Sequence, residues 1–235
     1  VSEIIAEGII PATLEMMDRL VMQAVEKSVH AGYPLDAEAV LIIELDGLSD
    51  GMDRLAQRVI EICKKNRVRA VNAAATDAER EKLWSGRKGA FGALGRLAPS
   101  YMVNDGTVPR TQLPHVLQKV AEIGKKYDVA IGNVFHAGDG NLHPVILFDE
   151  RDNHQLELVK KASYEILQAC VDVGGTITGE HGIGTEKLEA MWLLFGWKDL
   201  NAMWKVKRTF DPKSLCNPGK VLPEIEIEES KRAHA

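Results

Sequence analysis

Three features are scarce or absent in this sequence, and each limits the classes of protein to which the chain can belong. It has three cysteines in 235 residues, widely spaced and without a CxxC pair, which suits a reducing cytoplasm and predicts buried structural thiols. It has no apolar run near the roughly 20 residues that a membrane-spanning helix requires, and no visible signal peptide. It also has no basic excess: the net charge is −5, which excludes a broad nucleic-acid surface.

What remains is the composition of an ordinary globular protein, with 45% hydrophobic and 27% charged residues. This length suits one large domain or a domain with an extension. The first residue is Val, not Met, which predicts a piece of a longer protein.

Hydrophobic periodicity predicts helices that alternate with strands. The expected helices span 13–30, 51–66, 77–97, 113–127 and 153–173, with further helices near 185–195 and 199–210. A buried strand is expected at 39–45, a second strand at 68–74, extended chain at 102–108 and a hairpin at 129–148. Thr76 and Glu79 have the spacing of a capping box.

This order predicts an α+β fold, in which a ferredoxin-like antiparallel sheet carries helices on one face. We expect a domain at 1–174 and a C-terminal helical segment with an extended tail at 175–235, because the later residues are rich in Pro, Gly and Asn.

The hairpin stretch NVFHAGDGNLHPVILF contains two histidines that a turn does not require. The residues 139–141, Asp-Gly-Asn, supply the turn. His136 and His143 flank this turn, so both imidazoles are expected near it, on one face if the alternation of side chains holds. Two histidines alone form a weak metal site, because a catalytic metal usually has a third protein ligand.

The glycine-rich stretch GGTITGEHGIGTEK, residues 174–187, offers that third ligand. Its glycines permit close backbone approach, and they bracket Glu180 and His181. His136, His143 and Glu180 would form a set of two nitrogens and one oxygen. The alternatives are hydrogen-bonded structural histidines, and a phosphate loop, which is disfavoured because neither GxxxxGK[ST] nor GxGxxG is present.

Arg87 lies in EREKLWSGRKGAFG, where most charges suit a solvated helix face. Its guanidinium could instead bind a carboxylate through two hydrogen bonds.

Three motifs in order, GNVFHAGDGNLHPVILFD, GGTITGEHGIGTEK and FDPKSLCNPGKVLP, resemble the C-terminal half of FAD-linked oxidases. This family includes the glycolate oxidase flavin subunit, D-lactate dehydrogenase and D-2-hydroxyglutarate dehydrogenase. VLIIELDG, LWSGRKGAF and DGTVPRTQLP extend the resemblance over residues 12 to 223.

The resemblance implies a cap domain that supplies substrate-binding residues, while FAD is bound mainly by a domain missing from this chain. It places a divalent metal (Zn, Mn or Fe) on His136, His143 and Glu180. The catalytic histidine falls on His181, and the arginine that binds the substrate carboxylate falls on Arg87. It also places three tail residues near the cofactor or its domain: Asn217, Gly219 and Lys220.

Two departures from the family pattern favour glycolate or D-lactate over a dicarboxylate substrate. Met102-Val103-Asn104 occupies a strand where some members have a lysine, and Pro144-Val145 replaces an asparagine of the hydroxyglutarate enzymes.

The expected activity is an FAD-linked 2-hydroxy-acid oxidoreductase, with hydride transfer from the substrate α-carbon to flavin and an electron-acceptor partner other than a nicotinamide. The isolated chain is expected to be inactive and cytoplasmic, with membrane association only through a partner and with a homo-oligomer left open. Two other functions remain open: a non-catalytic cap-like module that pairs with a separate flavin subunit, and a metal hydrolase, which would leave the FAD-oxidase tail unexplained.

Overall fold

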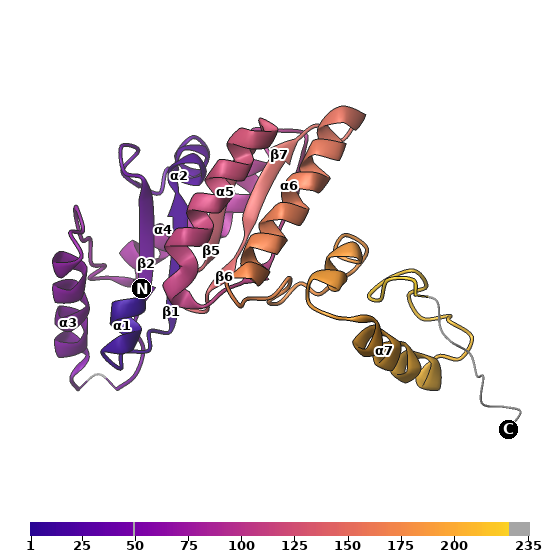
Figure 1. Cartoon of the computed structure of the whole chain (residues 1–235). Coiled ribbons are helices and arrows are strands. Elements are labelled where there is room, and N and C mark those ends of the chain that lie inside the picture. The colour runs from indigo at the N-terminus through magenta and orange to yellow at the C-terminus, as the bar shows by residue number, and fades with distance from the viewer. Residues whose placement is uncertain (49, 226–235) are drawn as a thin grey trace, which may run out of the picture.

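The structure, a computed structural model, describes residues 1–48 and 50–225 and contains an open antiparallel sheet (Figure 1). Strands β2, β1 and β5 follow one another across the sheet, and β5 then pairs with both β6 and β7. β4 pairs with β6, and β3 pairs with β7. The strands are β1 Thr13–Asp18, β2 Ala39–Glu44, β3 Ser100–Val103, β4 Gly106–Thr107, β5 Ala130–His136, β6 Asn141–Leu142 and β7 Pro144–Phe148.

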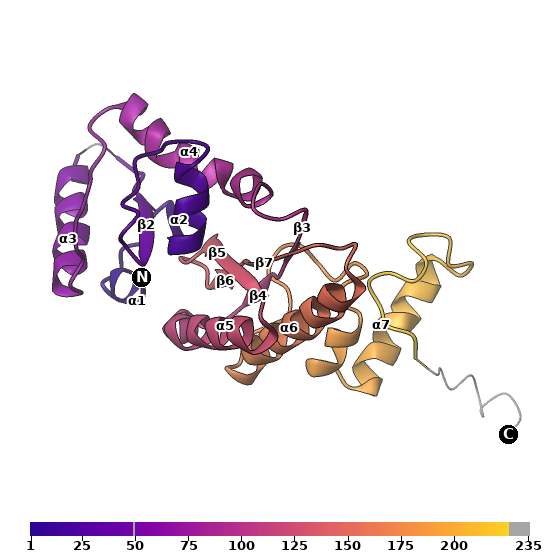
Figure 2. The same cartoon turned by 90° about the horizontal axis from the view of Figure 1, so that it is seen from above.

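Helices cover both faces of the sheet, so the helical cover extends beyond the single face that was predicted. Figure 2 shows α5 and α6 on one side and α2 and α4 on the other. The helices are α1 Ser2–Ala6, α2 Arg19–Glu26, α3 Met52–Lys65, α4 Asp77–Leu94, α5 Leu113–Tyr127, α6 Asn153–Asp172 and α7 Trp197–Phe210. Two 3-10 helices complete the described elements, η1 Arg110–Gln112 and η2 Glu189–Leu193. The predicted class, an α+β fold with an antiparallel sheet, is confirmed.

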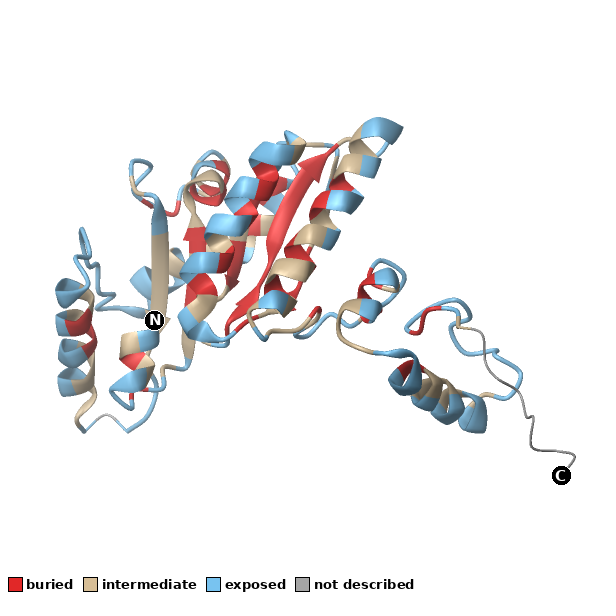
Figure 3. Ribbon diagram, viewed as in Figure 1, coloured by how far each residue is buried: buried red, intermediate tan, exposed pale blue. Residues whose placement is uncertain are grey.

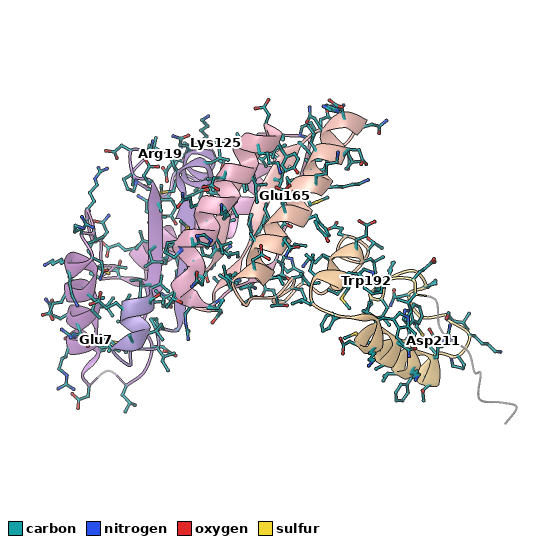
Figure 4. The ribbon with its side chains drawn as sticks, viewed as in Figure 1. Glu7, Arg19, Lys125, Glu165, Trp192 and Asp211 are labelled. Atoms are coloured by element: carbon teal, nitrogen blue, oxygen red, sulfur yellow. The ribbon has the colours of Figure 1, made fainter. Side chains whose placement is uncertain are left out.

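Alternation along the central strands divides the main core into two layers. Phe135 and Ile146 pack beneath α5 and α6, whereas their neighbours Val134 and Val145 pack beneath α2 and α4. Figure 3 shows this buried band along the central strands and on the inward faces of the helices. At the rim, Glu165 of α6 (labelled in Figure 4) accepts hydrogen bonds from Lys126 and Tyr127 at the end of α5.

The order β3, α5, β5, β7, α6 follows the first five elements of a ferredoxin-like fold. β7 lies between β3 and β5, and all these pairings are antiparallel. After α6, Thr176 forms an antiparallel bridge with Thr107 of β4. This bridge brings the glycine-rich stretch to the end of the sheet that carries the hairpin turn.

The helix predicted at 13–30 is wrong over its first six residues, which form β1. Leu14, Met17 and Val21 have helical spacing, but β1 pairs with β2 and β5, and this tertiary pairing overrides the local pattern. Helix α2 then begins at Arg19, where the Asp18 carboxylate accepts a hydrogen bond from the Val21 amide.

Two predicted strands also differ from the structure. Residues 68–74 run as exposed chain outside any strand, because no described strand lies beside them. The strand predicted to be buried at 39–45 is β2, which is largely half-buried because β1 is its single partner in the described sheet. The region 185–195 contains η2, a 3-10 helix. The predictions for α3, α5, α6 and the capping box of α4 are confirmed within about three residues.

The C-terminal segment has a small apolar cluster of its own, in which Ile177, Met191, Leu200 and Leu222 pack against Leu167 of α6. Figure 1 shows this segment to one side of the sheet. Its surface includes Trp192, labelled in Figure 4. The predicted tail continues to residue 235, but residues 226–235 lie outside the described part. Among the described helices, none is long and apolar enough to cross a membrane.

Candidate metal and substrate site

The site is built around Asp105, a fully buried carboxylate between β3 and β4. Its Oδ2 accepts hydrogen bonds from the Thr178 hydroxyl (2.6 Å), the amides of Gly179 (3.0 Å) and His181 (2.9 Å), and Lys187 Nζ (3.1 Å). Burial alone would raise the pKa of Asp105, but these donors hold it well below its usual range. Asp105 therefore fixes the backbone of the loop that presents Glu180 and His181.

Close packing of this loop depends on its glycines. A Cβ on Gly179 would lie 2.5 Å from the Thr107 hydroxyl, and one on Gly175 would lie 2.1 Å from the Thr107 carbonyl oxygen. The close backbone approach predicted from the glycine content is therefore present.

The hairpin brings His136 and His143 together, as predicted. His136 ends β5 and His143 lies between β6 and β7, with ring centroids 5.2 Å apart and ring planes nearly perpendicular. His136 follows Val134 by two residues and His143 precedes Val145 by two. Because Val134 and Val145 both face α2 and α4, this alternation puts both histidines on that face.

Glu180, one of the three predicted metal ligands, lies beside the other two, His136 and His143. Its Oε1 lies 3.2 Å from His143 Nε2 and 3.5 Å from His136 Nε2. It also lies 3.5 Å from His181 Nε2, and the His181 ring stacks on that of His143 with centroids 4.8 Å apart. Among the described residues, Asp105, His143, Glu180 and His181 each offer a ligand atom, and these atoms all lie within 4.8 Å of one another. His136 is not in this group of four and contacts it through Glu180.

The surroundings of the His143 Nε2 atom are compatible with a metal ion at this cluster. It is buried and has no hydrogen-bond partner among the described residues, which is costly for a polar atom unless a ligand completes it. Burial, with the neighbouring His136 and His181, lowers the pKa of His143 to about 4. The ring is therefore neutral near pH 7, the form that binds metals. Asp105 fits less well as a ligand, because its Oδ2 already accepts four hydrogen bonds of 3.1 Å or less.

Arg87 lies at the edge of this cluster and is joined to it by Glu15. Arg87 Nε donates to Glu15 Oε2 at 2.8 Å, and Glu15 Oε1 lies 2.6 Å from His136 Nδ1. Among the described residues, the two terminal nitrogens of the Arg87 guanidinium make no hydrogen bond. These nitrogens have the geometry to bind a carboxylate.

Comparison of the sequence with models of known protein families identifies the family of this chain. The model of the family described as "FAD linked oxidases, C-terminal domain" matches residues 1–221. The chain belongs to this family. The resemblance in the sequence motifs is thereby confirmed, and the family is one of oxidoreductases that use FAD.

Relatives of this FAD-linked oxidase domain include glycolate oxidase and D-lactate dehydrogenase proteins. The chain is 47% identical over 225 residues to glycolate oxidase subunit GlcD of Escherichia coli K12, covering 96% of this chain and 45% of the relative. GlcD of Bacillus subtilis is 40% identical (94% and 47% covered). The mitochondrial cytochrome D-lactate dehydrogenase of Arabidopsis thaliana is 29% identical (92% and 38% covered). The chain thus spans about half or less of the length of these curated relatives.

The fold of this FAD-linked oxidase domain is also found in a solved structure with little sequence similarity. 4-Ethylphenol oxidase from Gulosibacter chungangensis superposes with a TM-score of 0.58 at 11% identity, covering 90% of this chain and 48% of that one.

Sequence reasoning found the histidines, Glu180 and Arg87 of this domain but missed Asp105, Lys187 and Glu15. Glu15 had a detectable signal, because it is the one charged residue between Leu14 and Met17 in an apolar run. Asp105 and Lys187 had little signal in the sequence, because their importance depends on a buried contact between two residues that are 82 positions apart. The three residues predicted to lie near the cofactor, Asn217, Gly219 and Lys220, are in an exposed turn of the C-terminal segment. The next residue, Val221, donates a backbone hydrogen bond to Gly184 of the glycine-rich stretch.

Proposed function

We propose that this chain is the substrate- and metal-binding C-terminal part of an FAD-dependent 2-hydroxy-acid dehydrogenase or oxidase of the glycolate or D-lactate type. The observation that carries the proposal is the buried, unpartnered Nε2 of His143, 3.2 Å from Glu180 Oε1, with His136 Nε2 on the same oxygen. The identity to glycolate oxidase subunits over nearly the whole chain supports it.

His136, His143 and Glu180 would hold a divalent metal, and such a set of two nitrogens and one oxygen suits Zn, Mn or Fe. When bound, the metal would supply Lewis-acid polarisation of the substrate hydroxyl. The hairpin fixes the two imidazoles, and Asp105 fixes the loop that carries Glu180. The ligands are thus held by two separate parts of the fold, the hairpin and the glycine-rich loop.

Arg87 would bind the substrate carboxylate through its terminal nitrogens, which would fix the orientation of the α-carbon. His181, partly exposed and stacked on His143, would accept the proton of the hydroxyl group. The C–H bond electrons would leave as hydride, so that a 2-hydroxy acid becomes a 2-oxo acid. Flavin, bound mainly by a domain outside this chain, would be the hydride acceptor.

The substrate is proposed to be a small monocarboxylate because the chain has no lysine at residues 102–104 and no asparagine at residues 144–145. Met102 pairs with Ile146 between β3 and β7, and Val145 is fully buried in the core. Asn104 is buried, and its Oδ1 accepts a hydrogen bond from Ser163.

The C-terminal segment is proposed to contact the FAD-binding domain. Trp192, Phe210 and Leu215 are 46%, 85% and 76% exposed, which is a large apolar area for one segment. Asn217, Gly219 and Lys220 would then lie near the cofactor, with residues 1–174 as the cap and 175–235 as the returning segment. An electron-acceptor partner and a cytoplasmic location are part of the same proposal, which leaves the oligomeric state open.

Metal content is the first test. Elemental analysis of the purified chain after dialysis against Mn²⁺ or Zn²⁺ should show a stoichiometric metal, and this metal should be lost in His136→Ala/His143→Ala. A wild-type chain that stays empty with both metals would contradict the proposed site.

A test of the substrate class requires a protein that contains this chain together with its FAD-binding domain. Under anaerobic conditions, glycolate or D-lactate should bleach the absorbance of oxidised flavin, and D-2-hydroxyglutarate should bleach it far more slowly. If all three acids leave the flavin oxidised, the chain is a non-catalytic module.

A further inference from the structure

Glu15 and His136 are direct cross-strand partners in the sheet. Glu15 lies in β1 and His136 in β5, and the antiparallel register places them opposite each other. Their neighbours two residues along, Met17 and Val134, pack against α2 and α4. Glu15 and His136 therefore share the face that α2 and α4 cover (Figure 2). Arg87 of α4 contacts Glu15 on this face.

The Glu15 carboxylate bridges two groups of different kinds. Its Oε2 accepts a hydrogen bond from Arg87 Nε at 2.8 Å, and its Oε1 lies 2.6 Å from His136 Nδ1. The Glu15 side chain is 6% exposed, so neither contact competes with much water. In an ion pair with arginine a carboxylate only accepts hydrogen bonds. The imidazole proton of a neutral His136 must therefore be on Nδ1.

We propose that Glu15 is a positioning residue for His136: it holds the imidazole proton on Nδ1 and leaves Nε2 as a free lone pair directed toward the metal position beside Glu180. The proposal rests on the proposed function, because it assigns a role to a residue behind a metal ligand. A carboxylate behind a metal-ligating histidine fixes the orientation and proton position of the ring, and its loss usually weakens metal binding about 10- to 100-fold.

Arg87 determines which atoms of the side chain at position 15 can face His136. Its guanidinium is always charged and only donates hydrogen bonds, so it needs an acceptor at position 15. In Glu15→Gln the single amide oxygen would turn toward Arg87, and the amide NH₂ group would face His136. His136 Nδ1 would then accept a hydrogen bond, its proton would move to Nε2, and the lone pair for the metal would be lost.

The direct test is the proton position on His136 in the metal-free chain, read from long-range proton–nitrogen NMR spectra of the histidine rings. The wild type should carry the proton on Nδ1, and Glu15→Gln should carry it on Nε2. A wild-type ring with its proton on Nε2 would overturn the proposal, and this measurement requires no variant to fold.

Metal affinity is the second readout, measured by Mn²⁺ titration. Glu15→Gln should bind Mn²⁺ about 10- to 100-fold more weakly than the wild type. The double variant Glu15→Gln/Arg87→Met should recover most of this affinity, because without Arg87 the amide oxygen is free to accept from His136. A merely structural role of Glu15 predicts a further loss in the double variant, which would contradict the proposal.

A matched control is Glu44→Gln, the same substitution in an exposed ion pair, where Arg80 lies 2.7 Å from Glu44 on the neighbouring strand β2. It should leave both readouts unchanged. If the wild type binds neither Mn²⁺ nor Zn²⁺, the proposed metal function fails, while the proton position still decides the role of Glu15. If the wild type binds metal and Glu15→Gln binds it equally well, only the inference about Glu15 fails.

Discussion

His143 Nε2 lies 3.2 Å from Glu180 Oε1, and no described residue donates to it or accepts from it within hydrogen-bond geometry. The two residues come from different parts of the chain, one from the hairpin and one from the glycine-rich loop. Their meeting is the strongest sign that the fold has assembled a site for a ligand that the chain itself does not supply.

Glu180→Gln should lower metal affinity by at least about 100-fold, because an amide oxygen is a weaker ligand than a carboxylate and direct ligands matter more than their supports. The measurement is a Mn²⁺ titration of the wild type and the variant. His115→Ala, which removes an exposed histidine from α5, is the control and should bind like the wild type. Equal loss in both variants would indicate non-specific surface binding.

Lys187→Met should destabilise the loop at residues 178–182. Lys187 and Asp105 are almost fully buried, and loss of the ammonium group removes one of the donors that compensate the buried carboxylate. The expected loss is about 2–3 kcal/mol in denaturant unfolding, with faster amide exchange at Gly179 and His181. Lys119→Met, which breaks the exposed pair with Glu122, should cost less than about 1 kcal/mol. Equal losses for the two variants would contradict the role of Asp105.

Gly140→Ala should destabilise the chain more than Gly174→Ala. Both glycines have positive φ, +73° and +81°, so both substitutions carry the backbone penalty of about 1 kcal/mol. A Cβ on Gly140 would also lie 2.1 Å from the Val108 carbonyl oxygen, whereas one on Gly174 meets open space. We expect a loss of more than about 2 kcal/mol for Gly140→Ala, with weaker metal binding because the hairpin turn carries His136. Similar free energies of unfolding would show that the turn can shift away from Val108.

Cys170 should be unreactive in the folded chain over a wide pH range. Burial on the inward face of α6 raises the pKa of its thiol from 9 to about 12. At about pH 8 the thiolate fraction is therefore about 1000-fold lower than in the unfolded chain, and alkylation should slow at least in proportion. Peptide mass spectrometry of the native chain should find label on the exposed Cys216 and not on Cys170.

The pH dependence of stability from this thiol has a defined sign. The pKa of the Cys170 thiol is higher in the folded chain than in the unfolded chain. Its contribution to the free energy of unfolding is therefore fully present below about pH 9. It falls as the thiol of the unfolded chain ionises, and it is fully lost above about pH 12. Addition of denaturant should make Cys170 as reactive as Cys216. A Cys170 that reacts readily in the native chain would show that this part of the core opens.

The sequence predicted well the elements whose local signals agree with their packing. Helix α5 begins and ends where its apolar periodicity does, and α4 begins at the capping box of Thr76. It predicted poorly where pairing partners are distant. β1 has helical spacing and becomes a strand because β2 and β5 lie on either side of it, and residues 68–74 have strand composition without a strand beside them.

The candidate site shows the same division. His136, His143, Glu180 and His181 stand in motifs that a reader of the sequence can find. Asp105 gives little signal in the sequence, and Glu15 gives only that of a charge in an apolar run. Their roles exist only after folding, through contacts with residues 76 and 121 positions away, so sequence patterns do not reveal what these buried carboxylates do.

The position of β1 in the sheet has a consequence for synthesis of the chain on the ribosome. β1 precedes the other described strands in chain order, yet one of its two neighbours, β5, is made more than 100 residues later. Until then, a nascent chain that has completed β2 and α4 carries an open strand edge where Met16 and Met17 will later meet Phe135 and Val134. Such an edge is prone to pair with other chains. Synthesis of β5, residues 130–136, therefore supplies the strand that covers this edge of β1, and a pause before it would prolong exposure of the edge to chaperones or to aggregation.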